Sequence, residues 1–259
     1  MAEADPMTTP REALLDYTAL PTFTPDAAVL EEHKIVSLDS RDIRSRPFNL
    51  MRTKFTKQLY AHNLRMVGIT SPAPTAGKSC LSLNLAGAIA RLNDTPVLLV
   101  DLDLRRGSIA QDLGLEVQRG IGDFLEGKVG SIRDIAIRTE EFPLAILPTM
   151  PVSGDSSSLL ASENYAELMR QLRAEAEKSI VLVDLPPVFA NDDTMLTMEQ
   201  LDAYLMVVHS GKTTERQLRD SMEMLRPAPC IGTVLNRYKG GLADSYGYTS
   251  SKTYSRYYD

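Results

Sequence analysis

The chain has 259 residues, of which 43% are hydrophobic, so it is long enough to bury a sizeable core as one α/β domain with additional ends. Its formal net charge of −6 argues against a general nucleic-acid-binding protein. Its two cysteines, Cys80 and Cys230, are far apart and lack His or Cys neighbours at metal-ligand spacing, which argues against a zinc site or a disulfide framework. With no apolar run long enough to cross a bilayer, we expect a soluble, cytoplasmic protein that reaches the membrane only through a partner.

Residues 1–40 contain scattered Pro and Thr without a sustained period, which predicts a flexible N-terminal arm with at most one short helix. A helix is predicted from Pro47 onward, because proline suits the first turn and apolar residues recur on one face. That face carries Phe48, Met51, Phe55, Leu59 and His62. We expect this helix to open a domain that spans residues 41–240, followed by a tail over residues 241–259.

Short apolar runs alternate with helical patterns through the rest of the domain. Helical periods such as LSLNLAGAIARL and ENYAELMRQLRAEAEK separate several of the runs. The runs are MVGIT (66–70), PVLLVD (96–101), LAILP (144–148), SIVLVD (179–184), AYLMVV (203–208) and CIGTVL (230–235). This alternation predicts a doubly wound α/β fold with a mostly parallel sheet covered on both faces, and with ligands at the carboxyl ends of the strands.

The first apolar run leads into SPAPTAGKSC and then into a helical pattern. At such a junction backbone N–H groups face phosphates, Lys78 reaches the β- and γ-oxygens, and the Ser79 hydroxyl ligates Mg²⁺. Pro72 stands where the usual motif has its first glycine, so the strand and helix around the loop carry much of the argument. The predicted ATP-binding residues are Thr75, Ala76, Gly77, Lys78, Ser79 and Cys80.

A second Gly-Lys-Thr occurs at residues 211–213. Its upstream residues belong to an apolar strand run and cannot form the flexible cradle that phosphate binding requires. We interpret it as a strand-to-helix turn.

Acidic residues end two of the apolar runs. VLLVDLDLRRG places Asp101 and Asp103 after one strand, and IVLVDLPPVF places Asp184 after another. An isolated aspartate is most often a helix cap or a loop charge. Carboxylates at strand ends beside a phosphate loop instead hold Mg²⁺ or its waters, or accept a proton from an attacking hydroxyl.

The chain ends in YGYTSSKTYSRYYD, which contains five of the ten tyrosines and no aliphatic residue. Such a segment has nothing to pack as a core and is predicted to be disordered. Its tyrosines, Tyr246, Tyr248, Tyr254, Tyr257 and Tyr258, therefore require a role other than burial.

Three of these segments together resemble the nucleotide-binding motifs of the bacterial tyrosine kinases (BY-kinases) of capsule and exopolysaccharide assembly, within the MinD/ParA-like P-loop class. They are SPAPTAGKS, VLLVDLDLRRG and IVLVDLPPVFANDD, and the resemblance extends over roughly residues 45–259, including LMVVHSGKTTERQL, IGTVLNRYKGG and the tyrosine cluster. The resemblance implies that Mg-ATP phosphorylates the C-terminal tyrosines, commonly on a neighbouring subunit of a ring. Lys78, Ser79 and the three aspartates would form the catalytic and metal site, with Ser79, Asp101 and Asp184 as metal residues. Asn236 matches a position near the adenine base, although a plain turn-forming asparagine fits it nearly as well.

The resemblance also implies partners. Members without a membrane part work with a separate transmembrane polysaccharide co-polymerase that activates them, and a phosphotyrosine phosphatase acts on the tail. A homo-oligomer is implied too, yet the ring-forming helix usually carries one Glu and two Arg where this chain has Arg46, Asn49 and Arg52. Further departures are Thr75 for a frequent glycine, Cys80 for a frequent threonine and Gly107 for a usual proline.

Two other functions fit part of the pattern. A MinD/ParA-type ATPase switch usually carries a signature lysine at the place of Ala73, and the chain has no basic amphipathic C-terminal helix. A weakly catalytic nucleotide-binding scaffold of the polysaccharide machinery would fit the altered helix and loop, but the three acids and the tyrosine cluster argue against it.

Overall fold

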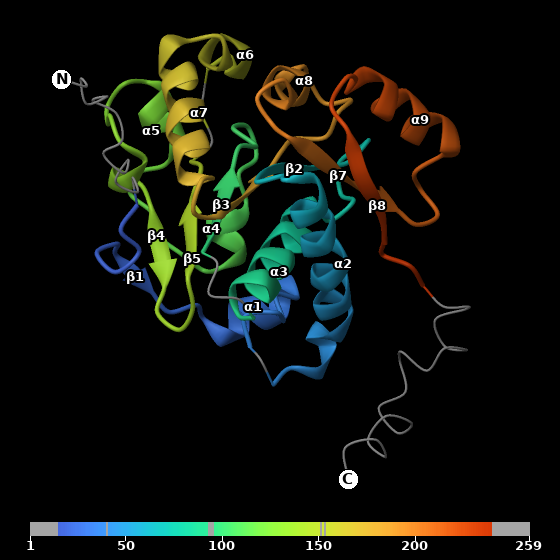
Figure 1. Ribbon diagram of the computed structural model, residues 1–259, viewed down its shortest axis with the longest axis horizontal. Helices are drawn as coiled ribbons and strands as arrows, with labels where there is room; N and C mark the ends of the chain where they lie inside the picture. Colours follow the sequence, from blue (N-terminus) through green and yellow to red (C-terminus); the bar gives the residue numbers. More distant parts are fainter. Residues whose placement is uncertain (1–14, 40, 93–95, 151, 153, 240–259) are drawn as a thin grey trace, which may run out of the picture.

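The computed structural model describes residues 15–39, 41–92, 96–150, 152 and 154–239. These residues form one twisted sheet with helices on both faces (Figure 1). The strand order is β1-β4-β5-β3-β6-β2-β7-β8, and every neighbouring pair is parallel except β4 with β5. The strands are β1 (Thr22–Phe23), β2 (Met66–Thr70), β3 (Val97–Asp101), β4 (Ile137–Thr139), β5 (Leu144–Leu147), β6 (Ile180–Asp184), β7 (Ala203–His209) and β8 (Cys230–Asn236).

The predicted doubly wound, mostly parallel fold is confirmed. All six predicted apolar runs are strands, and β2, β3, β5 and β6 are buried at every position, as expected for strands covered on both faces. Two short strands, β1 and β4, were not predicted because two or three residues are too few to show a period.

Helices cover the two faces of the sheet and enclose two apolar clusters. One cluster contains Phe124, Leu168 and Met198 from α5, α7 and α8, and the other contains Phe55 and Leu59 from α2 together with most of α3. The helices are α1 (Ala27–His33), α2 (Arg46–His62), α3 (Lys78–Ala90), α4 (Ile109–Asp112), α5 (Ile121–Leu125), α6 (Ser156–Leu160), α7 (Glu163–Glu175), α8 (Asp193–Met198) and α9 (Glu215–Met224), with 3₁₀ turns at Ile43–Ser45 and Ile132–Asp134.

The helix predicted from Pro47 is α2, and proline lies in its first turn. Phe55 and Leu59 are buried against α3, whereas His62 is exposed. Within the described residues, no helix combines the length and the apolar character that crossing a membrane requires.

The N-terminal segment over residues 15–39 is packed onto the domain, so the prediction of a flexible arm to residue 40 does not hold there. Its apolar side chains Leu15, Leu20 and Ile35 are at most 5% exposed. β1 adds a strand beside β4 at one edge of the sheet. The burial of this segment was not predicted, because its apolar residues are spaced without a helical or strand period. The residues that bury them lie far away along the chain. Residues 1–14 and the tail from residue 240 lie outside the described residues.

The P-loop helix holds this segment through one buried side chain. Asn84 of α3 accepts hydrogen bonds from the backbone N–H groups of Val36 and Ser37, both at 2.9 Å. Its amide nitrogen donates to the carbonyls of Lys34, at 3.0 Å, and Cys80, at 2.8 Å. The segment therefore rests directly on the helix that begins at the predicted phosphate site.

Candidate nucleotide and phosphoryl-transfer site

The loop between β2 and α3 has the backbone form of a phosphate cradle. Gly77 caps α3 with a φ of 87°, and the helix begins at Lys78. The first N–H groups of a helix lack intrahelical partners and carry partial positive charge, so they favour an anion. The segment after β6 braces the loop, because Val188 N–H donates to the Ser71 carbonyl at 2.9 Å and Phe189 N–H donates to the Pro72 carbonyl at 3.2 Å.

Asn236 packs against this loop from the end of β8. Its amide nitrogen donates to the Ala76 carbonyl at 2.8 Å, and a Cβ on Gly77 would stand 2.5 Å from the same nitrogen. Its carbonyl oxygen accepts the backbone N–H of Arg237 at 2.9 Å, inside a turn where Arg237 has a φ of 57°. Asn236 thus shapes a turn and holds the loop backbone, and Gly77 is required both by its φ and by this close contact.

Thr75 occupies a conformation that favours glycine. Its φ is 67°, and a β-branched residue in this left-handed region is strained by about 1–2 kcal/mol. The side chain itself is exposed, so no packing contact explains the choice of threonine. The departure noted in the sequence is therefore a point of backbone strain at the tip of the cradle.

Lys78 and Asp103 meet across the site. The Lys78 ammonium lies 3.5 Å from an Asp103 carboxylate oxygen, and both side chains are about nine-tenths buried, at 11% and 10% exposure. The carboxylate keeps the lysine within the site, where its charge is available to phosphate oxygens. Asp103 also accepts the backbone N–H of Arg106 at 3.2 Å, which holds the turn after β3.

Asp101 and Asp184 lie side by side at the carboxyl ends of β3 and β6, where they are register partners. Asp184 accepts hydrogen bonds on both oxygens, from the Ser79 hydroxyl at 2.6 Å and from the Ser82 hydroxyl at 2.9 Å. Asp101 accepts the backbone N–H groups of Ile109, at 3.1 Å, and of residue 103, at 3.3 Å. Both carboxyl groups are completely buried.

Burial is the main reason that the pKa values of both carboxyl groups are raised. The pKa of Asp101 lies well above its usual range because of burial and then the charge of Asp184. The pKa of Asp184 is raised by burial, and Lys78 and the two serine hydroxyls oppose that rise. Two adjacent buried carboxylates repel each other, and a divalent cation would relieve this repulsion.

The oxygen-containing side chains at this edge of the sheet fit Mg²⁺ bound together with a nucleotide. Mg²⁺ commonly takes one or two carboxylates, waters and substrate phosphates rather than an all-protein cage. Ser79, Asp101 and Asp184 supply a hydroxyl and two carboxylates at the start of α3. The described residues contain no cluster of three or more His, Cys, Asp or Glu side chains arranged to hold a metal alone.

Two residues near the acids, Ser82 and Thr149, were not singled out from the sequence. Ser82 was missed although it lies three residues after Ser79, a spacing that places both hydroxyls on one face of α3. Gly107 and Thr149 come together beside Asp101, where a Cβ on Gly107 would stand 2.2 Å from Thr149 Cγ2 and 3.0 Å from Asp101 Oδ2. This crowding explains why residue 107 is not a proline here, because a ring would require its neighbours to move.

The remaining predicted residues are less central. Cys80 is half-buried behind the cradle, and burial followed by the charge of Asp112 raises the pKa of its thiol, which disfavours a reactive thiolate. On α2, the Arg52 guanidinium donates to the Ala88 carbonyl at 3.2 Å and to Asn49 at 3.3 Å, so it packs on the P-loop helix of its own chain. The five predicted phosphorylation sites, Tyr246, Tyr248, Tyr254, Tyr257 and Tyr258, lie outside the described residues.

The second Gly-Lys-Thr forms the predicted strand-to-helix turn. Lys212 and Thr213 donate their backbone N–H groups to the His209 carbonyl, and α9 begins only at Glu215. Thr213 turns its hydroxyl back to accept the His209 N–H at 3.0 Å. The turn makes no contact with the acidic cluster in the hydrogen bonds and ion pairs of the described residues.

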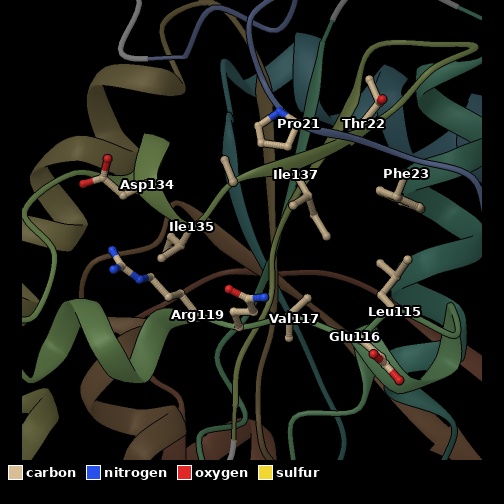
Figure 2. Close-up of a pocket in the computed structure, with 12 residues that line it drawn as sticks. Pro21, Thr22, Phe23, Leu115, Glu116, Val117, Arg119, Asp134, Ile135 and Ile137 are labelled. Atoms are coloured by element: carbon tan, nitrogen blue, oxygen red, sulfur yellow. The ribbon is translucent and has the colours of Figure 1, made fainter.

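One cavity in the described part of the chain lies away from these residues. It has a volume of about 410 Å³ and lies at the β1–β4 edge of the sheet (Figure 2). Its walls come from β1, from β4 and from the segment after α4, including Leu115 and Arg119, and they contain none of the predicted nucleotide residues. The predicted nucleotide and acidic residues lie instead at the carboxyl ends of β2, β3 and β6.

Comparison with known proteins shows the family to which this chain belongs. The chain is 33% identical over 206 residues to the putative tyrosine-protein kinase EpsB of Ralstonia nicotianae, and 28% identical over 227 residues to the tyrosine-protein kinase YwqD of Bacillus subtilis. The YwqD match covers 86% of this chain and 93% of the relative. The chain belongs to the bacterial tyrosine kinase family. No protein-family model matches the sequence.

A solved kinase-domain structure agrees with this assignment. The crystal structure of the VpsO kinase domain is 29% identical, with a TM-score of 0.66, and the match covers 76% of this chain and 97% of that one. Several BY-kinase relatives are much longer, and the EpsB match covers 79% of this chain but 26% of EpsB. The chain thus spans about a quarter of the length of such relatives and nearly all of YwqD.

Proposed function

We propose that the chain is an ATP-dependent protein-tyrosine autokinase that phosphorylates its own C-terminal tyrosine cluster and thereby regulates capsule or exopolysaccharide polymerisation and export. The observation that carries this proposal is the convergence of Lys78, Ser79 and three aspartates on one edge of the sheet, with Lys78 3.5 Å from Asp103 and Ser79 2.6 Å from Asp184. A phosphate cradle beside buried carboxylates meets the needs of phosphoryl transfer, which depends on positioning and charge stabilisation.

In the proposed reaction Mg-ATP supplies the transferable phosphoryl group and a cation that offsets its charge. A tyrosine oxygen forms a bond to the γ-phosphorus as the bond to the β,γ-bridging oxygen breaks, and ADP leaves. Lys78 and the N–H groups at the start of α3 stabilise the phosphate oxygens. The Ser79 hydroxyl, held by Asp184, faces the metal position.

The phenol proton requires an acceptor on the protein. Asp184 uses both oxygens to hold Ser79 and Ser82, so its task is to position the metal-binding hydroxyl. Asp101 and Asp103, at the carboxyl end of β3, remain as the acceptors.

The regulatory part of the proposal rests on charge. Each phosphate adds about −1.5 to −2 charges, so a fully modified tail would repel neighbouring subunits of a homo-oligomer. We propose a separate transmembrane polysaccharide co-polymerase as the activator that recruits the chain to the inner face of the membrane, and a phosphotyrosine phosphatase that reverses the modification. No nucleic acid takes part.

Intact-mass spectrometry of the chain with Mg-ATP tests the proposal. Serial additions of phosphate are expected in the wild type, in the presence of the candidate membrane activator if the chain alone is slow. A form ending at Gly241 lacks the tyrosine cluster and is expected to gain no phosphate. ATP hydrolysis without any mass addition would instead identify an ATPase switch, and binding without hydrolysis or addition would identify a scaffold.

A further inference from the structure

The ends of β7 and β8 bring four basic side chains together. His209 and Asn236 are register partners at these ends, and Ser210 N–H donates to the Asn236 carbonyl at 2.9 Å. Lys212 follows in the turn after β7, while Arg237 and Lys239 follow β8 directly. We call His209, Lys212, Arg237 and Lys239 the basic cluster.

Among the described residues, no carboxylate pairs with the charged side chains of the cluster. Lys212, Arg237 and Lys239 are exposed. The pKa of His209 is lowered by burial and then by these three cations, so all of them act on the same small region. On a chain with a net charge of −6, such a group is a local site for an anion.

The basic cluster also adjoins the nucleotide site. Arg237 Nε lies 3.8 Å from the place where a Cβ on Gly77 would stand, and the preceding residue, Asn236, holds the Ala76 carbonyl. Lys212 lies three residues after His209, and Lys239 lies two residues after Arg237. An anion bound by these two lysines would therefore lie beside the nucleotide without replacing it.

Phosphorylation would change the charge of the segment after Lys239 from neutral to strongly negative. Residues 240–259 contain two acidic side chains, Asp244 and Asp259, and two basic ones, Lys252 and Arg256, so their formal charges cancel. Three phosphotyrosines would add about −4.5 to −6 charges. Tyr246 follows Lys239 by seven residues, which corresponds to at most about 25 Å of extended chain, so the tail and the cluster share a high effective concentration.

We propose that the basic cluster binds phosphotyrosine in residues 240–259 of the same chain, a step that rests on the proposed autokinase function. Phosphate oxygens accept charge-assisted hydrogen bonds from Lys212, Arg237 and Lys239. Unmodified tyrosines have no such attraction and remain free to reach a neighbouring active site. After phosphorylation the tail is retained on its own subunit, beside its own P-loop, and leaves the neighbour's site.

A binding experiment with a synthetic peptide tests this proposal without using the kinase reaction. A fluorescent peptide of residues 244–259, with phosphate on Tyr254, Tyr257 and Tyr258, is titrated with the phosphatase-treated full-length chain in the absence of ATP. Fluorescence anisotropy compares it with the unphosphorylated peptide. The paired variant Lys212→Ala with Lys239→Ala is compared with Lys54→Ala with Lys57→Ala, two exposed lysines of α2.

We expect the phosphopeptide to bind at least about tenfold more tightly than the unmodified peptide. The Lys212/Lys239 variant should bind the phosphopeptide about tenfold more weakly than the wild type. The α2 variant should bind it as tightly as the wild type. Equal binding of both peptides, or equal losses in both variants, would overturn the proposal. Vesicles of phosphatidylserine and phosphatidylcholine form a further arm, and lysine-dependent binding to them that exceeds phosphopeptide binding would assign the cluster to the membrane surface. Because the peptide is synthetic, an absence of autophosphorylation would reject the proposed function and leave this result standing.

Discussion

Two turns of this chain have almost the same sequence, Gly77-Lys78-Ser79 and Gly211-Lys212-Thr213, and both glycines have a positive φ, 87° and 74°. Lys78 starts a helix, is nine-tenths buried and meets Asp103. Lys212 is exposed in a turn, and α9 begins three residues later with its own capping box of Thr214 and Gln217. The backbone of the glycine is similar in both, but only the first turn lies next to the carboxyl ends of β3 and β6.

The tripeptide acquires its chemistry from the strand ends around it. The Ser79 hydroxyl donates a hydrogen bond to Asp184, whereas the equivalent Thr213 hydroxyl accepts the backbone N–H of His209 in its own turn. The four predictions below test this difference, beginning with the largest effect.

Exchanging the two lysines for methionine should separate the turns most clearly. Lys78→Met removes the cation that would stabilise the phosphate oxygens, so we expect tail phosphorylation to fall by at least about a hundredfold. Lys212→Met should retain catalysis, because Lys212 makes no contact with the carboxylates. Intact mass after incubation with Mg-ATP measures both, and substantial labelling of Lys78→Met would contradict the assigned site.

Removing one buried carboxylate tests the electrostatics that only the first turn has. Asp101→Asn should lower phosphorylation by roughly 10²- to 10⁴-fold, the range for loss of an acid or base. Because the folded-state pKa of Asp101 is raised, the unfolded chain binds fewer protons above pH 4, and stability falls as pH rises from the ordinary carboxyl value through the raised one. In Mg²⁺-free buffer the variant should show a shallower fall of unfolding free energy with pH. Urea titrations of the wild type and of Asp101→Asn at several pH values measure how the unfolding free energy changes with pH. Equal slopes in the two proteins would contradict a raised pKa at Asp101.

The attachment of the P-loop helix to the N-terminal segment is a further difference from α9. Asn84→Ala leaves the buried N–H groups of Val36 and Ser37 without an acceptor, so we expect a loss of about 2–4 kcal/mol in unfolding free energy. Asn49→Ala, which removes weaker contacts on α2, is the control and should cost less than about 1 kcal/mol. Urea unfolding compares the two, and similar losses would show that Asn84 is not a special anchor.

The smallest effect concerns backbone strain at the tip of the first turn. Thr75→Asn places a residue that tolerates the left-handed region at a φ of 67°, and we expect a gain of about 1 kcal/mol, or about 2–4 °C in Tm. Thr75→Val retains the β-branched side chain and should give no gain. Thermal unfolding of both variants decides whether the threonine is strained as its φ indicates.

The sequence alone predicts the centre of this molecule better than its edges. Six apolar runs become strands because burial on both faces leaves a continuous apolar signal, and Asp101, Asp103 and Asp184 are found because parallel strands end together. Ser82 and Thr149 were not predicted, since their roles depend on which side chains meet in space. The packing of residues 15–39 was missed for the same reason: Asn84, which holds this segment, lies about 50 residues away along the chain.

β1, the strand that the N-terminal segment contributes, limits where a shortened fragment of the chain can begin. A fragment starting at residue 41 would leave the β4 edge without β1 and would uncover the surfaces that Leu15, Leu20 and Ile35 now cover. Unpaired strand edges and newly exposed apolar patches promote self-association. A fragment that keeps β1 and these three buried side chains therefore begins no later than residue 15.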